Sequence, residues 1–472
     1  MGDAVKTRAV VLGGSIAGLF AARVLADAYD EVLIVDRDVL VGVEGPRRHC
    51  PQSRHINGLL ARGQRVMEEL YPGITEQLFA DGVPTGDLAG SVRWYFNGSR
   101  LRQRHAGLVC VAASRPKLEH HIRERTRVLP GVVFAERHDI LGLEATPDRS
   151  RVIGVRVQSL DGDDGAGEEK VISADLVVDA TGRGSRTPIW LEALGYPRVE
   201  EERTKIGLGY VTQHYRLTAD PYHGDLSINP VASPALPRGA IFTKTDGDRV
   251  ELTTYGILGD HPPTDQEGLY AWVKSLAVPD IYDALQHAEP LDEPVAFRFP
   301  TTLRRRYERM SRFPDGLLVT GDAVCCFNPV YAQGMTVAAL GALVIRAQLH
   351  TGAVPDPAQY FADLAREVID QPWEMTHTVD LGFPGVPGER TRKVRVAQAF
   401  LRMVQTAATR DGVVAAAYMR GAGLVDGPEA LMRPAMLARI LWNALPRGRR
   451  AQEPPRTRRP AGVAEKVKAS AP

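Results

Sequence analysis

The sequence predicts an α/β protein in which a parallel-sheet domain is discontinuous along the chain, with an inserted β-sheet domain and a C-terminal helical region. Three observations predict this arrangement. Near the N-terminus a buried strand, a helix and a second buried strand follow one another, as in a parallel βαβ unit. Alternating apolar and polar residues dominate the middle of the chain and indicate a second sheet. A buried strand and an apolar helix then return near residue 317.

The composition is that of an ordinary globular enzyme or binding protein. A chain of 472 residues exceeds one compact core, so two or three domains are expected. The formal net charge of +1 lacks the basic excess typical of a nucleic-acid binder. The 4 cysteines have neither zinc-site nor CxxC spacing, which favours a reducing compartment and predicts no metal site. With no recognisable export signal and no bilayer-spanning run, we expect a cytoplasmic protein without a transmembrane segment.

The first part of the discontinuous domain is assigned to residues 1–187. It begins with the strand AVVLGG, the helix IAGLFAARVLADAY and the strand EVLIVD. Helical periodicity returns at about residues 57–78 and again in SRPKLEHHIRERTRVL, where Ser114 is a plausible N-cap and Pro116 fits the first turn. Alternating segments around SVRWYF and LVCVAAS, and those following residue 131, are predicted to be strands, ending in the buried VISADLVVDATG.

The remaining segments follow from the same periodicities. Residues 188–312 alternate in KIGLGYVTQHYRL, RGAIFTKT, DRVELTTYGIL and EPVAFRFPTTL, which predicts a β-rich substrate domain. Residues 313–373 contain the strand GLLVTGD and the helix QGMTVAALGALVIRAQL, which complete the first domain. We assign residues 374–445 to a helical region and residues 446–472 to a disordered basic tail. A membrane-surface role of that tail is an open alternative.

The segment GGSIAG joins the first strand to the first helix. Its glycines are Gly13, Gly14 and Gly18, and Ser15 replaces the middle glycine of a G-x-G-x-x-G pattern, with Ala17 before the last. Glycines in this pattern allow a tight turn and a close approach of backbone N–H groups to a pyrophosphate. The next strand ends at Asp36, where a carboxylate can accept hydrogen bonds from ribose hydroxyls, and Arg37 follows it. We therefore expect a Rossmann-like dinucleotide site.

No second fingerprint is present, because GRGSRT and GLGYVT lack the last glycine and a following helix. This excludes a separate nicotinamide domain of the kind found in disulfide reductases. The function therefore has to be inferred from the other segments expected to contact the single bound dinucleotide.

The segment VTGDAVCCFNPVYAQGMTVAAL resembles the FAD-dependent monooxygenases of the p-hydroxybenzoate hydroxylase and squalene epoxidase superfamily. The resemblance implies that a strand ends at Gly321 and Asp322, and that the Asp322 carboxylate hydrogen-bonds the ribityl chain of FAD. It places Pro329 beside the flavin. Gly334 and Met335 would begin a helix whose positive N-terminal end faces the flavin N1 and C2 oxygen and stabilises an anionic ring.

Two further segments share this resemblance. In SRPKLEHHI, Arg115 resembles the family's arginine and implies contact with the FAD phosphates or ribose, the alternative being a solvated arginine at a helix start. In LVVDATGRGSRTP, Asp179, Thr181, Gly182 and Ser185 look like the second nucleotide motif. This chain reads ATGRGS where many hydroxylases read DGxxS followed by arginine, and this departure puts a cofactor role for Arg186 in doubt.

A third segment, CPQSRHINGLL, contains a PQ-x-x-H pattern. By resemblance Gln52 and His55 lie near the flavin, the alternative being a loop with surface polar residues. Together with FNPVYAQGM and ATGRGS, this segment makes the chain most similar to bacterial olefin epoxidases of the polyether type, such as the lasalocid and monensin enzymes.

The resemblance implies an FAD-dependent monooxygenase that transfers one oxygen atom from a flavin C4a-hydroperoxide to a hydrophobic substrate. Alkene epoxidation in polyketide, antibiotic or other specialised-metabolite biosynthesis is the activity expected. O2 is a substrate, and NAD(P)H supplies electrons directly or through a flavin reductase. The protein must orient the alkene and exclude water, so we expect an apolar pocket between the FAD-binding domain and the second sheet, with Tyr210, Phe242 and Phe299 as candidates to line it.

Other functions stay open at this point. An aromatic hydroxylase would want a base near the substrate, for which His214 or Tyr215 could serve. A geranylgeranyl reductase-like enzyme would reduce the alkene. Rab escort and GDP-dissociation-inhibitor proteins use a related fold to bind partners without flavin. Flavin halogenases would require a WxWxIP segment, which the sequence lacks, so halogenation is discounted.

Overall fold

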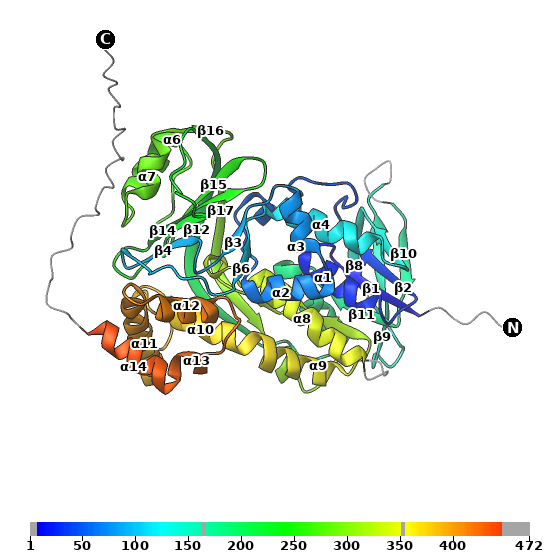
Figure 1. The fold of residues 1–472 in the computed structure, drawn as a ribbon. Coiled ribbons are helices and arrows are strands. Elements are labelled where there is room, and N and C mark those ends of the chain that lie inside the picture. Colours follow the sequence, from blue (N-terminus) through cyan, green and yellow to red (C-terminus); the bar gives the residue numbers. More distant parts are fainter. Residues whose placement is uncertain (1–6, 162–166, 351–354, 446–472) are drawn as a thin grey trace, which may run out of the picture.

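The computed structural model describes residues 7–161, 167–350 and 355–445. A parallel sheet with its helices occupies one end of the molecule, and a larger, mainly antiparallel sheet stands at the other (Figure 1). The C-terminal helices lie below the larger sheet in this view. The predicted basic tail, residues 446–472, lies outside the described residues.

The parallel sheet has five strands in the order β18-β11-β1-β2-β7. Its strands are β1 (Arg8–Leu12), β2 (Glu31–Val35), β7 (Val132–Ala135), β11 (Leu176–Asp179) and β18 (Leu317–Val319). Because both faces are covered, β1, β11 and β18 are buried at every or nearly every position, as parallel strands usually are. A separate three-stranded sheet, β10-β9-β8, packs beside β11. Its strands are β8 (His138–Ala145), β9 (Val152–Ser159) and β10 (Glu169–Ser173).

The discontinuity predicted from the sequence is confirmed by the position of β18. Val178 of β11 is in register with Leu318 of β18, although 139 sequence positions separate them. Two long apolar helices, α1 (Ile16–Leu25) and α8 (Gly334–Leu349), pack against each other on this sheet. The N-terminal and returning segments therefore share one hydrophobic core.

The larger sheet has nine strands, eight of them in the order β19-β17-β12-β15-β14-β13-β4-β5, with β16 paired to β12. The strands are β4 (Val92–Phe96), β5 (Ser99–Arg100), β12 (Glu201–Leu217), β13 (Ser227–Pro230), β14 (Arg238–Thr245), β15 (Arg249–Gly256), β16 (Ala288–Pro290), β17 (Val295–Arg305) and β19 (Cys325–Cys326). A small pair, β3 (Thr85–Asp87) and β6 (Val109–Val111), stands apart.

The topology departs from the sequence prediction at β4 and β5. Both lie within residues 1–187, yet β4 pairs in parallel with β13, with Trp94 in register with Asn229. Alternation predicts a half-buried strand but not the sheet that receives it, because the pairing partner is distant in sequence. Residues 92–100 are therefore part of the second sheet.

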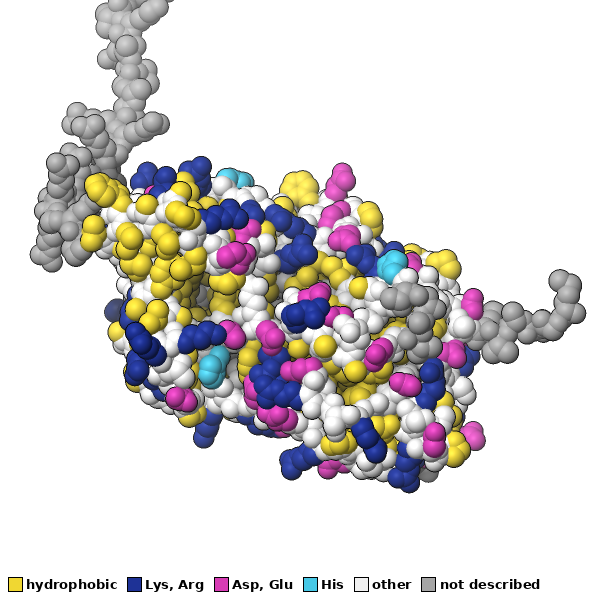
Figure 2. All heavy atoms as spheres, turned by 90° about the horizontal axis from the view of Figure 1, so that it is seen from below, with side chains coloured by type: hydrophobic (Ala, Val, Ile, Leu, Met, Phe, Trp, Pro, Cys, Tyr) yellow, Lys and Arg dark blue, Asp and Glu magenta, His cyan; other side chains and the backbone are white. Residues whose placement is uncertain are grey.

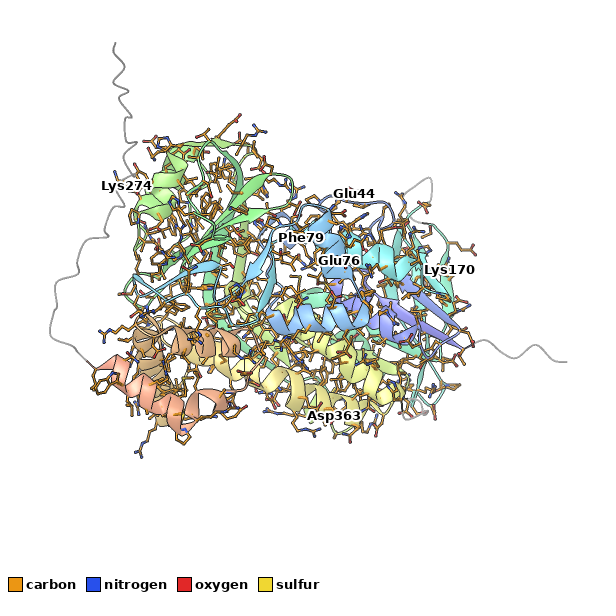
Figure 3. All side chains as sticks on the ribbon, viewed as in Figure 1. Glu44, Glu76, Phe79, Lys170, Lys274 and Asp363 are labelled. Atoms are coloured by element: carbon orange, nitrogen blue, oxygen red, sulfur yellow. The ribbon has the colours of Figure 1, made fainter. Side chains whose placement is uncertain are left out.

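The two faces of the nine-stranded sheet carry different coverings. Helices α6 (Gln266–Lys274) and α7 (Asp280–Leu285) pack on one face over a core of aromatic and aliphatic side chains. The helices after residue 369 face the other side (Figure 1). Since successive side chains alternate between faces, neighbouring residues of each strand serve different halves of the molecule. The labelled Lys274 on α6 and Lys170 on β10 mark opposite ends of the molecule (Figure 3).

The remaining helices complete the covering layers. They are α2 (Ala61–Leu70), α3 (Ile74–Ala80), α4 (Arg115–Arg127), α5 (Thr187–Ala193), α9 (Pro357–Asp363), α10 (Asp370–Asp380), α11 (Arg392–Ala408), α12 (Gly412–Ala422), α13 (Glu429–Met432) and α14 (Pro434–Ala444). The helix predicted at residues 57–78 is two helices, because Pro72 and the left-handed Gly73 interrupt it. Helix α4 begins as predicted, with the Ser114 hydroxyl accepting a hydrogen bond from the Lys117 N–H.

Hydrophobic side chains gather on the surface of the C-terminal helices (Figure 2). Val396 on α11, Met432 on α13 and Leu441 on α14 are each more than half exposed. Within the residues that the structure describes, no helix has the length and apolarity needed to cross a membrane.

Candidate active site

The glycine turn between β1 and α1 has the close contacts that a dinucleotide cradle requires. Gly13 has a left-handed φ of +97°, and a Cβ there would lie 2.8 Å from the Ala180 carbonyl oxygen. A Cβ on Gly18 would lie 1.8 Å from the Gly13 carbonyl oxygen, so the helix can approach the turn only without a side chain. A Cβ on Gly14 would overlap the Leu40 side chain at 2.2 Å. Backbone contacts thus require glycine at positions 13 and 18, whereas a side chain at position 14 would have to displace the end of Leu40.

Ser15, which replaces the middle glycine, has its hydroxyl engaged on both sides. It donates to Glu119 Oε2 at 2.9 Å and accepts from Arg115 Nη2 at 2.9 Å. Its backbone is extended at the N-cap of α1, a conformation that serine adopts without strain. Ser15 therefore ties the cradle to the start of α4.

Arg115 belongs to a buried cluster of charges beside the cradle. Its Nη1 donates to Asn57 Oδ1 at 3.3 Å, and its Nε donates to Glu119 at 3.3 Å. Arg47 Nε donates to the other oxygen of Glu119 at 2.9 Å. Burial acts to raise the pKa of Glu119, but Arg115, Arg47 and the Ser15 hydroxyl together hold it below its ordinary value. Glu119 is therefore an anion that orients two arginines at the cradle.

Asp36 lies at the end of β2, as predicted. Its carboxylate accepts the Gly14 N–H at 2.6 Å and the Asp38 N–H at 2.8 Å. Burial raises its pKa, while Arg47 and the two backbone N–H groups oppose that rise. Arg37 instead points away and forms a half-exposed ion pair with Asp139 at 2.5 Å. The geometry places Asp36, but not Arg37, toward the cradle.

The ATGRGS loop is organised by a carboxylate at its start. Asp179 is fully buried and accepts hydrogen bonds from the hydroxyls of Thr181, Ser185 and Thr187 at 2.6, 2.5 and 2.6 Å. Gly182 follows with a left-handed φ of +78°, and its Cβ position lies 4.0 Å from Asp322 Cβ. Asp179 thus shapes the loop, and the loop lies against the other nucleotide segment.

The segment from Gly321 to Met335 brings the two nucleotide segments to one place. A Cβ on Gly321 would lie 2.8 Å from Ala17 Cβ, and a Cβ on Gly334 would lie 3.5 Å from Asp322 Oδ1. Burial raises the pKa of Asp322, and Arg115 and the Cys326 thiol act against that rise. Helix α8 begins at Gly334, with Met335 buried in its first turn. Asp322, the start of α8 and the cradle therefore lie together, as the sequence predicts.

Gln52 and His55 belong to a short helical turn that reaches the second sheet. His55 Nδ1 lies 2.9 Å from Thr212 Oγ1, and its ring meets Tyr210 edge to face at 4.8 Å. Burial, with a smaller effect of Arg54, lowers the pKa of His55 to about 4, so the ring is neutral at physiological pH. Gln52 is partly exposed, and its carbonyl oxygen accepts a hydrogen bond from Asn57. The segment also contacts the turn before α8, because a Cβ on Gly58 would lie 2.8 Å from Ala332 Cβ.

The three aromatic residues predicted to line the pocket lie in different places. Tyr210 stacks on Phe297 beside His55, at a centroid distance of 5.2 Å. Phe299 is buried below the Arg183 guanidinium, which lies 4.8 Å from the ring centroid. Phe242 is fully buried on the opposite face of the sheet, against Tyr222 and the core under α6 and α7. The prediction for Phe242 is therefore wrong, because strand alternation turns Ile241 and Thr243, not Phe242, toward the cavity, and neither Tyr210 nor Phe299 is among the residues that line it.

A cavity of about 1240 Å³ lies between the nine-stranded sheet and the C-terminal helices. Strands β4, β13, β14 and β15 line one side, and helices α10, α11 and α12 line the other. Residues 56–60 and 329–333, the latter including Pro329 and the turn before α8, also line it. The prediction placed the pocket between the two sheets, whereas helices after residue 369 supply one of its walls.

The turn before α8 is fixed by a buried carboxyl on α10. Asp380 accepts hydrogen bonds from Asn328 Nδ2 at 2.9 Å and from the Tyr331 hydroxyl at 2.8 Å. Burial raises the pKa of Asp380 to about 6. Tyr331 lines the cavity, and Ala332 takes a left-handed φ of +54°, which is strained for a residue with a Cβ. The C-terminal helices therefore set the shape of the turn that separates the cavity from the cradle.

One curated relative decides the family. Protein Rv3254 of Mycobacterium tuberculosis is 34% identical over 435 residues, covering 89% of this chain and 90% of the relative. The chain belongs to the family of Rv3254. No protein-family model matches the chain.

Solved structures similar to this member of the Rv3254 family are flavoproteins. A flavoprotein/dehydrogenase from Cytophaga hutchinsonii has a TM-score of 0.62 at 15% identity, covering 93% of this chain and 98% of that one. CmlS, a flavin-dependent halogenase, has a TM-score of 0.61 at 16% identity, covering 89% and 77%. PqsL, a probable FAD-dependent monooxygenase from Pseudomonas aeruginosa, has a TM-score of 0.59 at 16% identity, covering 87% and 98%. The fold is that of FAD-dependent monooxygenases and halogenases.

The residues at the cradle of this chain fit an FAD molecule. Gly13, Gly14 and Gly18 leave the turn without side chains at three positions, and Arg115 contacts the turn at Ser15 while Asp36 accepts the Gly14 N–H. Among the buried donors without a hydrogen-bond partner in the described part of the chain are Arg183 Nη1, in the loop after β11, and Gln333 Nε2, at the N-cap of α8. Orphaned donors at such positions match a ligand rich in phosphate and carbonyl oxygens.

Sequence reasoning missed several residues of this region. Arg47 lies in a Pro/Arg/His-rich loop without a periodic pattern, and Asn57 stood at the start of the predicted helical stretch, so no signal assigned either to the cradle. Glu119 could have been found, since it follows Arg115 by one helical turn on the same face of α4. Tyr331 is within the quoted FNPVYAQGM segment, but its partner Asp380 is on a helix 49 residues later.

Proposed function

We propose that this protein is an FAD-dependent monooxygenase that transfers one oxygen atom to a lipophilic substrate held in the 1240 Å³ cavity. The observation that carries the proposal is the turn at residues 329–333. It lines the cavity, and it leads directly into α8, whose first residue lies against Asp322 at the nucleotide cradle. A cofactor held by the cradle would therefore present its reactive end to a substrate in the cavity.

Each part of the chain has a separate task in this proposal. Asp36 and Arg115 bind the adenosine and phosphate end, and Asp322 holds the ribityl chain. Reduced flavin, when bound, activates O2 and supplies the oxygen atom. The N-terminus of α8 provides N–H groups and about half a positive charge, which stabilise negative charge that develops at its end. Gln333 adds an unpartnered amide donor at the same end.

The cavity walls orient the substrate and exclude water. The helical wall carries apolar side chains, among them Met375, Phe400 and Met419. The volume exceeds the roughly 300–1,000 Å³ of typical ligand pockets, which suits a substrate larger than a single aromatic ring. Exclusion of water protects a reactive oxygen donor from unproductive decay.

We place epoxidation of an alkene first among the possible reactions. Neither His55 nor His214 lines the cavity, so neither is placed to take a proton from a phenol held there: His55 Nδ1 is engaged with Thr212, and His214 is paired with Asp292. Epoxidation needs no base, because the activated oxygen is itself electrophilic. The proposal also includes three expectations that come from the sequence alone. They are a role in polyketide or antibiotic biosynthesis, a reductase partner for NAD(P)H and a cytoplasmic location.

The test is isotope-labelled turnover of the purified protein. Flavin content is measured first from the visible absorbance. The reduced protein is then mixed with 18O2 and either a lipophilic polyene or a phenol, with and without bromide, and the products are analysed by mass spectrometry.

Each product class has a distinct meaning. One 18O atom added across a double bond supports epoxidation. Label on the phenol ring would replace it with hydroxylation, a brominated product would replace it with halogenation, and a saturated alkene would overturn oxygenation in favour of reduction. A protein that binds no flavin would overturn the whole proposal and favour partner binding.

A further inference from the structure

Glu251 is a buried carboxyl group that lines the cavity. It lies on β15, is 3% exposed, and belongs to the cavity wall formed by the nine-stranded sheet. No hydrogen bond or ion pair joins its carboxyl group to any other group in the described part of the chain. Buried carboxyl groups are normally paired, so an unpaired one on a cavity wall points to a missing partner.

The residues around Glu251 are committed to other partners. On the neighbouring strands, Thr243 and His214 are in register with Glu251 and share its face of the sheet. The Thr243 hydroxyl donates to the Lys244 carbonyl oxygen at 3.1 Å, and His214 Nδ1 lies 2.6 Å from Asp292. Arg249, two residues earlier on β15, pairs with Asp246 at 3.3 Å. The protein therefore offers Glu251 no internal partner.

Glu251 shares a face of the sheet with the residues that contact His55. Thr253, two residues along the same face of β15, shares a hydrogen bond of 2.7 Å with Thr212, which lies 2.9 Å from His55. Two residues of a strand span about 7 Å. Glu251 therefore lies about 7 Å along β15 from Thr253, the residue that connects this strand to His55 through Thr212.

We propose that Glu251 selects the substrate by hydrogen-bonding a neutral hydroxyl or carbonyl oxygen of an otherwise lipophilic molecule. The proposal rests on the proposed function, in that the occupant of the cavity is the substrate. The carboxyl O–H donates to the substrate oxygen, and its C=O can accept from a substrate hydroxyl. Burial raises the pKa of Glu251 to about 8, with Asp246 and Asp292 adding to the rise and Arg249 opposing it, so the carboxyl is protonated at physiological pH.

The neutral form also decides between two kinds of ligand. A cationic amine would need an ionised carboxylate and would itself lose hydration among the apolar residues of the helical wall. A hydroxyl or carbonyl oxygen loses little, because the protonated carboxyl replaces the hydrogen bonds that water gave it. The sheet side of the cavity supports this choice, since Ser227, Asn229 and Thr245 also line it.

The test uses three probes with one hydrocarbon body and different ends: farnesol, farnesene and farnesylamine. Their affinities are measured by displacement of Nile red from the protein as purified. The variants are Glu251→Gln and Glu251→Leu, with Glu293→Gln, an exposed position before β17, as the control. Because no turnover is needed, a flavin-free protein would end the proposed function while this measurement still decides the role of Glu251.

The expected result is that farnesol binds about tenfold more tightly than farnesene to the wild type and to the control. Glu251→Leu should abolish this preference and leave farnesene affinity within about twofold, and Glu251→Gln should keep part of it. Equal binding of farnesol and farnesene, absence of binding by either, or an unchanged preference in Glu251→Leu would each overturn the proposal. Tighter binding of farnesylamine than of farnesol would overturn it as well, because it requires an ionised carboxylate.

Discussion

Replacing Glu251 with glutamine should change how the free energy of unfolding of the protein without substrate depends on pH. The pKa of Glu251 lies near 8 in the folded protein and near 4.5 for an ordinary glutamate. Between these values the unfolded chain has released the proton and the folded chain still holds it, so stability falls as the pH rises. A difference of 3.5 pH units corresponds to a contribution of about 5 kcal/mol to the free energy of unfolding. This contribution is fully present below pH 4.5 and is lost once the pH passes 8.

This loss should be visible as a shift of melting temperature. An unfolding entropy of about 2.1 cal/mol/K per residue gives about 1 kcal/mol/K for 472 residues, so 5 kcal/mol corresponds to about 5 °C. Melting curves of the wild type, Glu251→Gln and the Glu293→Gln control are recorded from pH 5 to 9 with saturating FAD. The charged and polar side chains near Glu251, namely His214, Asp246, Arg249 and Asp292, are the same in all three proteins, so their contributions cancel in the difference.

The expected difference has a definite sign. Relative to Glu251→Gln, the wild type should lose about 4 °C between pH 5 and pH 8.5, since part of the 5 kcal/mol is already lost at pH 5, and the control should follow the wild type. Parallel curves for the wild type and Glu251→Gln would refute the reasoning, because they would mean that the carboxyl ionises in the folded protein as freely as in water.

Three further variants test the cradle and the turn. Gly18→Ala puts a Cβ 1.8 Å from a carbonyl oxygen of its own turn, so the purified protein should carry less than about a tenth of the wild-type flavin by absorbance, whereas Gly45→Ala, with open space around it, should carry a normal amount. Glu119→Gln leaves buried arginines without their anion and should lower the free energy of unfolding in urea by about 3–5 kcal/mol, and an unchanged midpoint would contradict this. Tyr331→Phe removes a hydrogen bond to Asp380, so it should lower the free energy of unfolding by about 1–2 kcal/mol and raise the share of O2 released as hydrogen peroxide. If all the consumed O2 still entered product, the turn would keep its shape without this hydrogen bond.

The sequence predicted most of the dinucleotide-binding half. The glycines, Asp36, Arg115 and Asp322 are separated by long stretches of chain, yet each belongs to a short pattern with its own local geometry, and the structure brings them together. The role of Ser15 was the part that pattern alone left unanswered, because its hydrogen bonds go to a helix about 100 residues away.

The substrate half could be predicted only in outline. Alternation identifies a strand but not the face that meets a cavity, so Phe242 was assigned to the wrong face of β14. The same limit hid the entry of β4 into the second sheet, since its partner β13 lies more than 130 residues away. Glu251 gave no signal at all, because a single glutamate in an alternating strand reads as a solvent-facing position.

The late position of β18 has a consequence for how the chain is made. On the ribosome β11 is complete at Asp179, but the strand that pairs with its outer edge begins only at Leu317. At about 5–20 residues per second, synthesis of the intervening stretch takes roughly 7–28 s. During that interval the nascent parallel sheet has an unpaired edge that is apolar from Leu176 to Val178, the kind of surface on which strands of other chains can add. Slow steps or chaperone binding during production should therefore concentrate between residues 180 and 317, before the cradle can close on its cofactor.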